Sequence, residues 1–246
     1  MTSQVMALAP MDFEHQLRCM CDAAYERQIP PDSTLERIFR GELPQADVRA
    51  WFLGRWNRVL ILAQHVLPNL LRRCPDLTAR VALCPAIAVE YGNGDLDRAH
   101  PTMYRRFVCA LGTAEEQFAE RLSAVPALDE QVARVESMTW LELLGQFLGR
   151  ETVGPKVFDG LASALKKHYG VSDRDLEWFA VHGVQDVADS DVIFGLARRY
   201  GDSVAAQAEI RTALTSWFEE SPYCYRFCTS SYRFAKAPPR HASASG

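Results

Sequence analysis

The stretch AVEYGNGDLDRAHPTMYRRF, residues 88–107, interrupts a chain whose apolar residues otherwise recur at helical spacing. It contains Gly92 and Gly94, and a glycine inside a helix costs about 1 kcal/mol relative to alanine. Glu90 and His100 flank the interruption. The pattern predicts either an ordinary loop or a helix broken in two, with its halves held apart around a bound group.

Helical periodicity continues on both sides of this break. Ser33 and Glu36 form the pattern of a capping box at the start of a short helix. Residues 45–74 are strongly apolar and predict a long helix that is kinked near Pro68. No alternating pattern of useful length predicts a strand, so we expect an all-α bundle of about seven or eight helices. Further helical segments are predicted over residues 11–28, 77–91, 100–112, 127–148, 151–169, 172–201 and 203–220.

Composition limits the class of protein. The chain has 246 residues, which suffice for a sizeable core, and we expect a single domain over residues 1–235 with a disordered tail over 236–246. A formal net charge of -4 without a basic face argues against nucleic acid as the main partner. No apolar run is long enough to span a membrane, and the N-terminus lacks a secretory pattern. Seven cysteines without a framework spacing favour a reducing, cytoplasmic setting.

Three polar residues share one face of a predicted helix. His182, Asp186 and Asp189 stand at positions i, i+4 and i+7, so their side chains project in one direction. They follow the apolar residues Trp178 and Phe179. An imidazole and two carboxylates beside apolar residues are unusual for a face toward the core. Two interpretations stay open from these residues alone: a solvated acidic surface, or ligands of a metal ion.

Glu90, His100 and Glu151 provide a second set of candidate ligands. Each has an ordinary explanation, because a glutamate near a helix end is usually exposed and a histidine at a helix start can serve in capping. Their joint occurrence is more informative. Helical bundles build metal sites by directing carboxylates and imidazoles inward from several helices. Mixed imidazole and carboxylate ligation suits iron or manganese better than a structural zinc site rich in thiolates.

The order of these residues resembles the heme-oxygenase-like di-iron oxidases and oxygenases. That family has a glutamate and a histidine separated by nine residues, as in EYGNGDLDRAHPTMYRRFVCALG over residues 90–112. A second glutamate follows about fifty residues later, and a His-x3-Asp pair follows about thirty residues after that. The segment ALKKHYGVSDRDLEWFAVHGVQD, residues 164–186, is similar to the later helices of the family. The resemblance runs from about residue 35 to residue 218.

The resemblance implies two non-heme irons with O2 as co-substrate. The family usually has a histidine three residues after the aspartate, where this chain has Asp189, a residue that can bind iron through oxygen. Members that oxygenate nitrogen also tend to have a carboxylate on the preceding long helix, where this chain has Gln64 and His65, so His65 is a candidate additional ligand. The ligands that the resemblance implies are Glu90, His100, Glu151, His182 and Asp186, with Asp189 as the sixth.

The same resemblance implies an O2-activating oxygenase or oxidase that acts on a small amine or amino-acid-derived metabolite. N-oxygenation is favoured, and oxidative C–C cleavage is the alternative at the same site. A metal-free, cofactor-independent oxidase stays open, since pyrroloquinoline quinone synthase and the TenA-type thiaminases share the superfamily fold. So does a binding protein whose metal site has decayed. An external electron donor and a homodimer are compatible with the resemblance, whereas a membrane or nucleic-acid partner is not expected.

Overall fold

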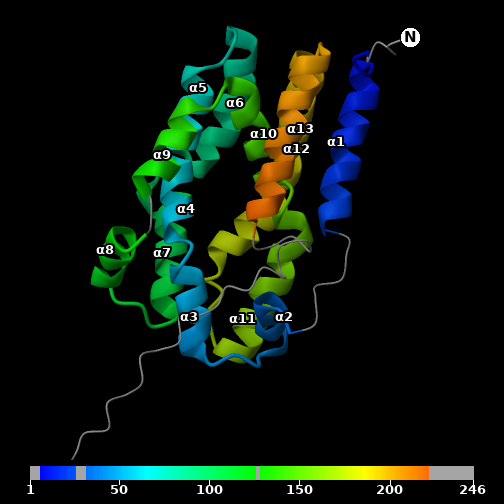
Figure 1. Ribbon diagram of the computed structural model, residues 1–246. Coiled ribbons are helices and arrows are strands. Elements are labelled where there is room, and N and C mark those ends of the chain that lie inside the picture. The colour runs from blue at the N-terminus through cyan, green and yellow to red at the C-terminus, as the bar shows by residue number, and fades with distance from the viewer. Residues whose placement is uncertain (1–5, 26–31, 126–127, 222–246) are drawn as a thin grey trace, which may run out of the picture.

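The computed structural model describes residues 6–25, 32–125 and 128–221, and within these ranges the chain forms helices without any strand (Figure 1). The prediction of an all-α fold is therefore confirmed. The α-helices are α1 (Pro10–Tyr25), α2 (Thr34–Arg40), α3 (Gln45–Leu53), α4 (Trp56–Ile61), α5 (Leu67–Arg72), α6 (Leu77–Glu90), α7 (His100–Ala110), α8 (Glu116–Ser123), α9 (Leu128–Ser137), α10 (Trp140–Glu151), α11 (Asp159–Tyr169), α12 (Glu177–Tyr200) and α13 (Val204–Glu220). Two π-helical turns, η1 (Leu62–Val66) and η4 (Gly154–Phe158), and two 3-10 turns, η2 (Gly92–Gly94) and η3 (Leu96–Arg98), complete the described elements.

The described residues contain more helices than the seven or eight predicted, because long segments are divided. The segment 45–74 is interrupted at Gly54 and again at the π-helical turn η1. Pro68 lies in the first turn of α5, directly after the π-helical turn η1, so the irregular part of this segment is next to the proline. A proline removes a main-chain N–H from a helix, which fits a change of hydrogen-bond pattern at this point.

The turn η1 leaves main-chain carbonyls that side chains satisfy. The Tyr91 hydroxyl donates to the Ala63 carbonyl at 2.5 Å, and the Asn69 amide donates to the His65 carbonyl at 2.9 Å. A π-helical turn shifts the hydrogen-bond pattern by one residue, which makes such partners necessary. Tyr91 thus connects the end of α6 to the middle of the segment formed by α4, η1 and α5.

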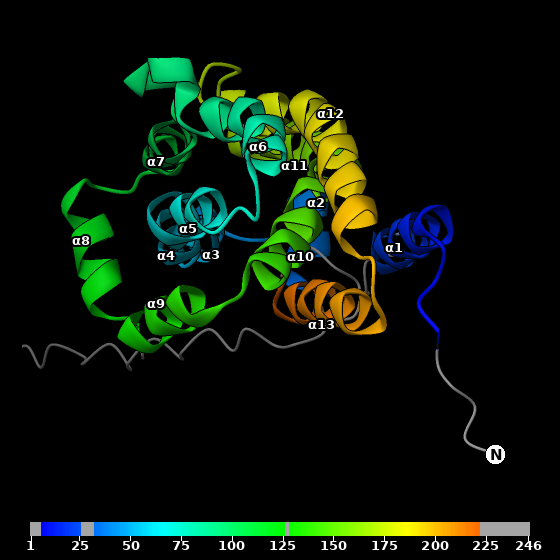
Figure 2. The same cartoon turned by 90° about the horizontal axis from the view of Figure 1, so that it is seen from above.

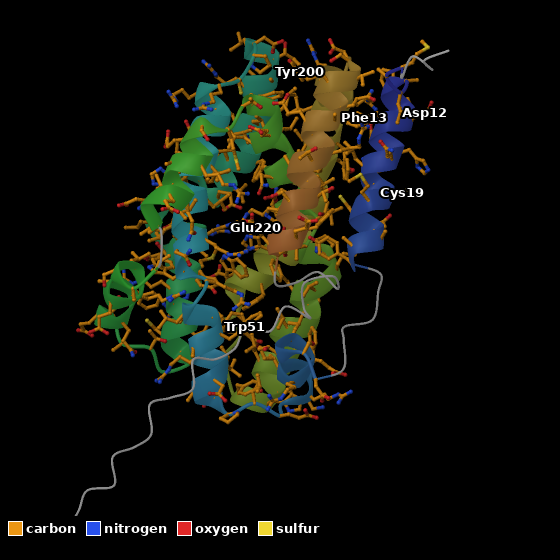
Figure 3. The ribbon with its side chains drawn as sticks, viewed as in Figure 1. Asp12, Phe13, Cys19, Trp51, Tyr200 and Glu220 are labelled. Atoms are coloured by element: carbon orange, nitrogen blue, oxygen red, sulfur yellow. The ribbon has the colours of Figure 1, made fainter. Side chains whose placement is uncertain are left out.

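The helices surround a central segment. Seen from above, α4 and α5 lie inside a ring formed by α6 to α10, and α1 lies on the outside against α12 (Figure 2). Phe13 of α1 points toward the bundle and is fully buried, whereas Asp12 and Cys19 point outward (Figure 3). No helix among the residues described has the length and apolar character that crossing a membrane requires.

Two apolar clusters fill the interior. One gathers side chains of α5, α6, α10 and α13, the other gathers side chains of α3, α4, α7 and α11, and α12 contributes to both. On α12 the change from one cluster to the other occurs between Phe179 and Ile193. The buried side chains between these two positions are all polar, namely His182, Asp186, Asp189 and Ser190. A polar layer therefore separates the two clusters.

The break at residues 92–98 is confirmed as a set of tight turns between α6 and α7. Gly92 has a φ of 69° and Gly94 a φ of 89°, both in the left-handed region that favours glycine. A Cβ on Gly92 would lie 2.5 Å from the Ala99 nitrogen, whereas a Cβ on Gly94 would meet nothing within 4 Å. The close approach at Gly92 brings the end of α6 against the start of α7.

The predicted disordered tail, residues 236–246, lies outside the described residues. The boundaries of the predicted single domain, 1–235, also include undescribed segments at both ends and stay a prediction. The part of the chain that resembles the di-iron family runs from α2 to α13. The structure describes all of it except residues 126 and 127. The polar layer lies inside this region.

We predict that Gly92→Ala destabilises the protein more than Gly94→Ala does. Both substitutions place a Cβ in the left-handed region, which costs about 1–2 kcal/mol. Only the Gly92 substitution adds a clash with main-chain atoms of Ala99. Urea denaturation of the two variants measures the difference in the free energy of unfolding, and equal losses would show that the turn has room at Gly92.

Candidate metal centre

Glu90 and His100 meet across the break between α6 and α7. Glu90 is the last residue of α6 and His100 the first of α7, and both are buried. The Nδ1 atom of His100 lies 3.0 Å from Oε2 of Glu90, without the alignment of a hydrogen bond. The glycine turns thus allow two ligand-type side chains from successive helices to face each other, as the sequence predicts.

His182 of α12 completes a group of three. Its Nδ1 donates to the main-chain carbonyl of Trp178 at 2.6 Å, which fixes the proton on that nitrogen. The other nitrogen, Nε2, therefore presents a lone pair and lies 3.9 Å from Oε1 of Glu90. A backbone acceptor behind the ring is the usual way in which a metal-binding histidine is oriented.

These three residues are placed as metal ligands would be. One ligand atom from each of Glu90, His100 and His182 lies within 4.8 Å of the others, and all three residues are buried. The imidazole rings of His100 and His182 have centroids 4.3 Å apart. Three of the six residues predicted from the sequence are therefore brought together directly.

The other three predicted residues lie close by and are also buried. Glu151 is the last residue of α10, while Asp186 and Asp189 follow His182 on α12. The turn η4 lies directly against Asp186, since a Cβ on Gly154 would be 2.4 Å from Oδ2 of that residue. Oε1 of Glu151 and Oδ2 of Asp186 are buried without a hydrogen-bond partner among the described residues.

Asp189 has the most exposed environment of this set. Gln185 donates a hydrogen bond of 3.4 Å to its Oδ1. Burial and the negative charge of Glu90 raise the pKa of Asp189, while Gln185 and His100 oppose that rise. Asp189 is thus close enough to Glu90 and His100 to interact with them electrostatically, and it is not on a solvated face.

The charges of the site differ from residue to residue. Burial raises the pKa of Glu151 and of Asp186 well above the ordinary range, and neighbouring carboxylates add to the effect. Burial alone would also raise the pKa of Glu90, but Arg150 and His100 outweigh it, so the pKa of Glu90 lies well below its ordinary value. Burial, together with His100, lowers the pKa of His182 to about 3, so this imidazole is neutral at neutral pH.

Arg150 is the residue of this site that the sequence analysis missed. Its guanidinium lies 3.6 Å from Oε1 of Glu90 and 3.7 Å from Oε1 of Glu151, and it is 3.5 Å from Nε2 of His182. The signal in the sequence is a charged residue at the end of the apolar segment WLELLGQFLGRE, directly before Glu151. Arg150 supplies positive charge among the carboxylates.

His65, the candidate additional ligand, has a different partner. Its Nδ1 lies 3.1 Å from Oε1 of Glu136 on α9. Arg72 lies 3.7 Å from the other oxygen of the same carboxylate. The structure pairs His65 with Glu136 rather than with the group formed by Glu90, His100 and His182, so we leave it out of the ligand set.

The donor set fits iron. Two imidazoles and up to four carboxylates provide nitrogen and oxygen ligands, as non-heme iron and manganese prefer. Three buried ligand-type atoms here have no hydrogen-bond partner among the described residues, namely Nε2 of His100, Oε1 of Glu151 and Oδ2 of Asp186. Buried polar atoms are normally satisfied, so a group of unsatisfied ones indicates an absent partner such as a cation.

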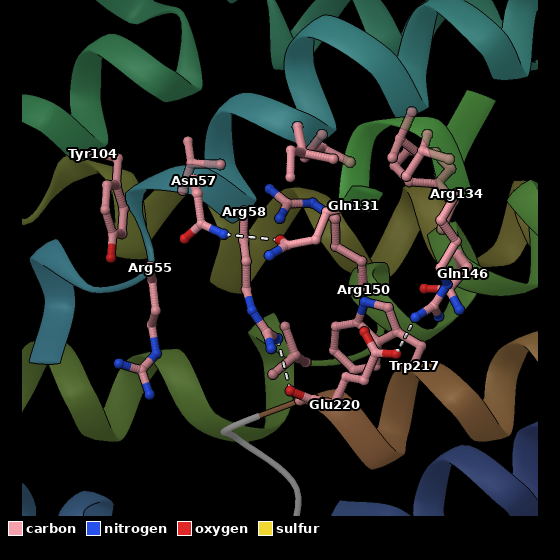
Figure 4. Close-up of a pocket in the computed structure, with 18 of the residues that line it drawn as sticks. Arg55, Asn57, Arg58, Tyr104, Gln131, Arg134, Gln146, Arg150, Trp217 and Glu220 are labelled. Atoms are coloured by element: carbon pink, nitrogen blue, oxygen red, sulfur yellow. Dashed lines mark hydrogen bonds and ion pairs between the residues drawn. The ribbon is translucent and has the colours of Figure 1, made fainter. Parts of the chain in front are cut away.

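A cavity of about 480 Å³ adjoins this site and shares His182 and Arg150 with it. Its wall is formed mainly by side chains from α4, η1, α7, α8, α9, α10, η4, α12 and α13, and part of it is drawn in Figure 4. Trp178 and Trp217 belong to the wall. A cavity of this size next to a group of ligand-type residues can hold a small molecule.

We predict that Asp189→Asn lowers the amount of iron bound, because the amide keeps the volume and loses the charge and basicity of a ligand. Asp189→His restores the residue usual in the family and is expected to raise the occupancy of the weaker site. The iron content of both variants is measured by metal analysis after anaerobic loading with ferrous iron.

The matched control for this prediction is Asp191→Asn, since Asp191 is exposed and pairs with Arg18 at 2.9 Å. It changes the same charge on the same helix without touching the site. If Asp189→Asn binds iron as tightly as wild type, Asp189 is not a ligand.

We also predict that metal binding releases protons. The raised pKa values of Glu151 and Asp186 mean that the metal-free protein holds protons there above the ordinary carboxyl range. The stability that these protonated carboxyls contribute is present at low pH and is lost as pH rises through their raised pKa values. A bound cation displaces the protons, so its affinity should rise with pH by about tenfold per pH unit for each proton released.

Calorimetry of Mn²⁺ binding in two buffers with different ionisation enthalpies measures the released protons. The neutral His182 contributes none, because its pKa is about 3. A heat of binding that is the same in both buffers would contradict the prediction.

Comparisons with known proteins show which proteins this chain is similar to. A TenA homolog from Pseudomonas syringae pv. tomato has a solved structure that superposes with a TM-score of 0.64 at 16% identity, covering 89% of this chain and 90% of that one. Pyrroloquinoline-quinone synthase of Xanthomonas oryzae pv. oryzae is 25% identical over 214 residues, which are 84% of this chain and 82% of that protein. The superposition on the TenA homolog shows that this chain has the same fold.

A second curated relative matches over a shorter region. It is 4-aminobenzoate synthase of Nitrosomonas europaea, which is 26% identical over 122 residues, 48% of this chain and 49% of that protein. This chain thus spans about half the length of that relative. The family of iron-containing redox enzymes matches residues 49–215, a range that includes every residue of the site described above. The chain belongs to this family of iron-containing redox enzymes, with the heme-oxygenase-like fold.

Proposed function

We propose that the protein is an O2-activating non-heme iron oxygenase or oxidase with a di-iron site. The observation that carries the proposal is the buried group of Glu90, His100 and His182, whose ligand atoms lie within 4.8 Å of one another. The three further buried carboxyls of Glu151, Asp186 and Asp189 supply enough ligands for a second ion. The match to the family of iron-containing redox enzymes supports iron as the metal.

Each side chain has a defined part in this proposal. Nε2 of His182 and a nitrogen of His100 would bind through their lone pairs, and Glu90 through its carboxylate. Glu151 and Asp186 would bind after they lose their protons. Iron bound in such a site supplies redox chemistry toward O2, and the protein contributes fixed ligands and a shaped cavity.

The surroundings favour chemistry that is shielded from bulk water. His182 is 1% exposed, and its ring lies against those of Trp178 and Phe158, with centroid distances of 4.2 and 5.7 Å. The cavity adjoining His182 is where we place the substrate. A low dielectric in this region strengthens the electrostatic interactions between the protein and a bound molecule.

For the reaction we favour N-oxygenation of an amino-acid-derived metabolite, with oxidative C–C cleavage as the second candidate. The relatives support an oxidase-type role, since they include 4-aminobenzoate synthase and pyrroloquinoline-quinone synthase. An external electron donor and a homodimer are compatible with this proposal, as they are with the family resemblance.

A metal-free oxidase is the competing function, because of the match to pyrroloquinoline-quinone synthase over 84% of this chain. The unsatisfied nitrogen and oxygen atoms of His100, Glu151 and Asp186 favour the metal-dependent function. Chelation separates the two, since a metal-free oxidase keeps its activity after metal is removed. A binding protein with a decayed site would bind no iron.

We predict that wild-type protein binds about two ferrous ions per chain under anaerobic conditions and shows a transient absorbance change when O2 is added. His100→Ala and His182→Ala should lose most of this iron while keeping their helicity. Loss of a residue that merely supports a metal ligand costs 10- to 100-fold in affinity, so loss of a ligand should cost at least about tenfold. Metal analysis and circular dichroism measure the two properties.

His15→Ala is the matched control, because His15 is an exposed histidine on α1. His65→Ala tests the alternative ligand in the same experiment, and we expect it to bind iron like wild type. Full iron content in His100→Ala and His182→Ala would remove these residues from the site and would overturn the proposal.

A further inference from the structure

The cavity next to the metal centre has an unusual charge for an apolar pocket. Among the described residues that line it, five are arginines and one, Glu220, is a carboxylate. Arginine stays protonated at all physiological pH values. Fixed charges in a cavity with low-dielectric walls act over longer distances than the same charges in water. The excess of arginines over carboxylates therefore influences which molecules enter the cavity. The arginines are Arg55, Arg58, Arg121, Arg134 and Arg150.

Two of these arginines are held only by neutral acceptors in the hydrogen bonds of the described residues. Arg58 donates to the main-chain carbonyl of Glu220 at 2.7 Å, and Arg121 donates to the carbonyl of Gly54 at 3.1 Å. A carbonyl fixes the orientation of a guanidinium and leaves its formal charge uncompensated. Arg58 and Arg121 therefore keep donors and positive charge for a ligand.

A third arginine shows how the cavity binds a carboxylate. Nη1 of Arg134 lies 2.8 Å from Oε1 of Glu220, and the close-up shows Glu220 with Arg58 and Arg134 on either side (Figure 4). Arg58 and Arg134 are exposed, whereas Arg150 and His182 are nearly buried at the metal centre. Arginines therefore line the cavity from its exposed end to the metal centre, and those at the two ends already face carboxylates of the protein.

The remainder of the wall is apolar. Val59, Leu62, Phe147, Trp178 and Trp217 face the same space. Arginines among aromatic and aliphatic side chains fit a molecule with an apolar body and an acidic group. A simple ammonium compound would meet like charges and a wall without compensating carboxylates, apart from Glu220.

We infer that this cavity takes a small carboxylate with an apolar body, and that Arg58 and Arg121 bind its acidic group. The inference rests on the proposed function in placing the substrate in this cavity. It narrows the substrate from small amines and amino-acid-derived metabolites to molecules that carry a carboxylate. An amino acid derivative meets this requirement when its carboxylate faces Arg58 and Arg121.

Three probes with one apolar body test the inference: 3-phenylpropionate, 3-phenylpropionamide and 3-phenylpropylamine. Their binding to the iron-free full-length protein is measured by calorimetry and by quenching of tryptophan fluorescence. We expect the carboxylate to bind at least about tenfold more tightly than the amide, and the amine more weakly than either. The affinity for the carboxylate should fall with added salt.

Variants assign the effect to the arginines. Arg58→Gln and Arg121→Gln should each weaken binding of 3-phenylpropionate by about tenfold and leave binding of the amide unchanged. Glu220→Gln should strengthen binding of the carboxylate severalfold, because it removes the competing carboxylate of the cavity. A gain of affinity cannot result from loss of folding.

Arg49→Gln is the matched control, since Arg49 also donates to a main-chain carbonyl, that of Gly112 at 2.9 Å, and does not line the cavity. Equal binding of the acid and the amide, or unchanged affinity in both Arg58→Gln and Arg121→Gln, would overturn the inference. Because the protein is iron-free, these results are independent of iron loading. A failure of the metal site appears instead as absent iron with intact carboxylate binding.

Discussion

The structure depends on keeping several ionisable side chains out of water in one place. Removing a carboxylate or an imidazolium from water costs several kcal/mol unless a partner compensates. Here four carboxyls and two imidazoles share one buried layer, between two apolar clusters that could otherwise have joined. Stability alone does not explain this arrangement, because apolar residues of similar size would pack at least as well. The compensation comes from Arg150, from protons held on Glu151 and Asp186, and in the proposed function from iron.

The polar layer is formed by the ends of α6, α7 and α10 and by the interior of α12. This arrangement explains which parts of the layer the sequence could predict. Periodicity identified the helices, and the glycines at 92 and 94 identified the break, because both are local properties. The spacing of His182, Asp186 and Asp189 placed them on one face, and their burial confirms that this face is not solvated. Predicting that Glu90 and His100 share a site with Glu151 required the family resemblance. No local rule brings together His100 and Glu151, which are 51 positions apart in the chain.

Other features could not be predicted because they depend on tertiary contacts. The division of the segment 45–74 at a π-helical turn depends on Tyr91 and Asn69, which satisfy its carbonyls. His65 has a plausible position in the sequence, yet its direction on the helix places it against Glu136. The charge of the cavity is contributed by helices α4, α8, α9 and α10 and by the residue before α4, so no single segment contains the pattern.

Arg150 belongs to two sites at once, and this has a thermodynamic consequence. Its guanidinium balances Glu90 and Glu151 on one side and lines the cavity on the other. If the proposed cation and the inferred carboxylate both bind, a cation held by the two glutamates would leave that guanidinium free to interact with the anion, and the anion would in turn draw it away from the glutamates. Occupation of either site would then favour occupation of the other, and linkage would make the two effects equal in free energy.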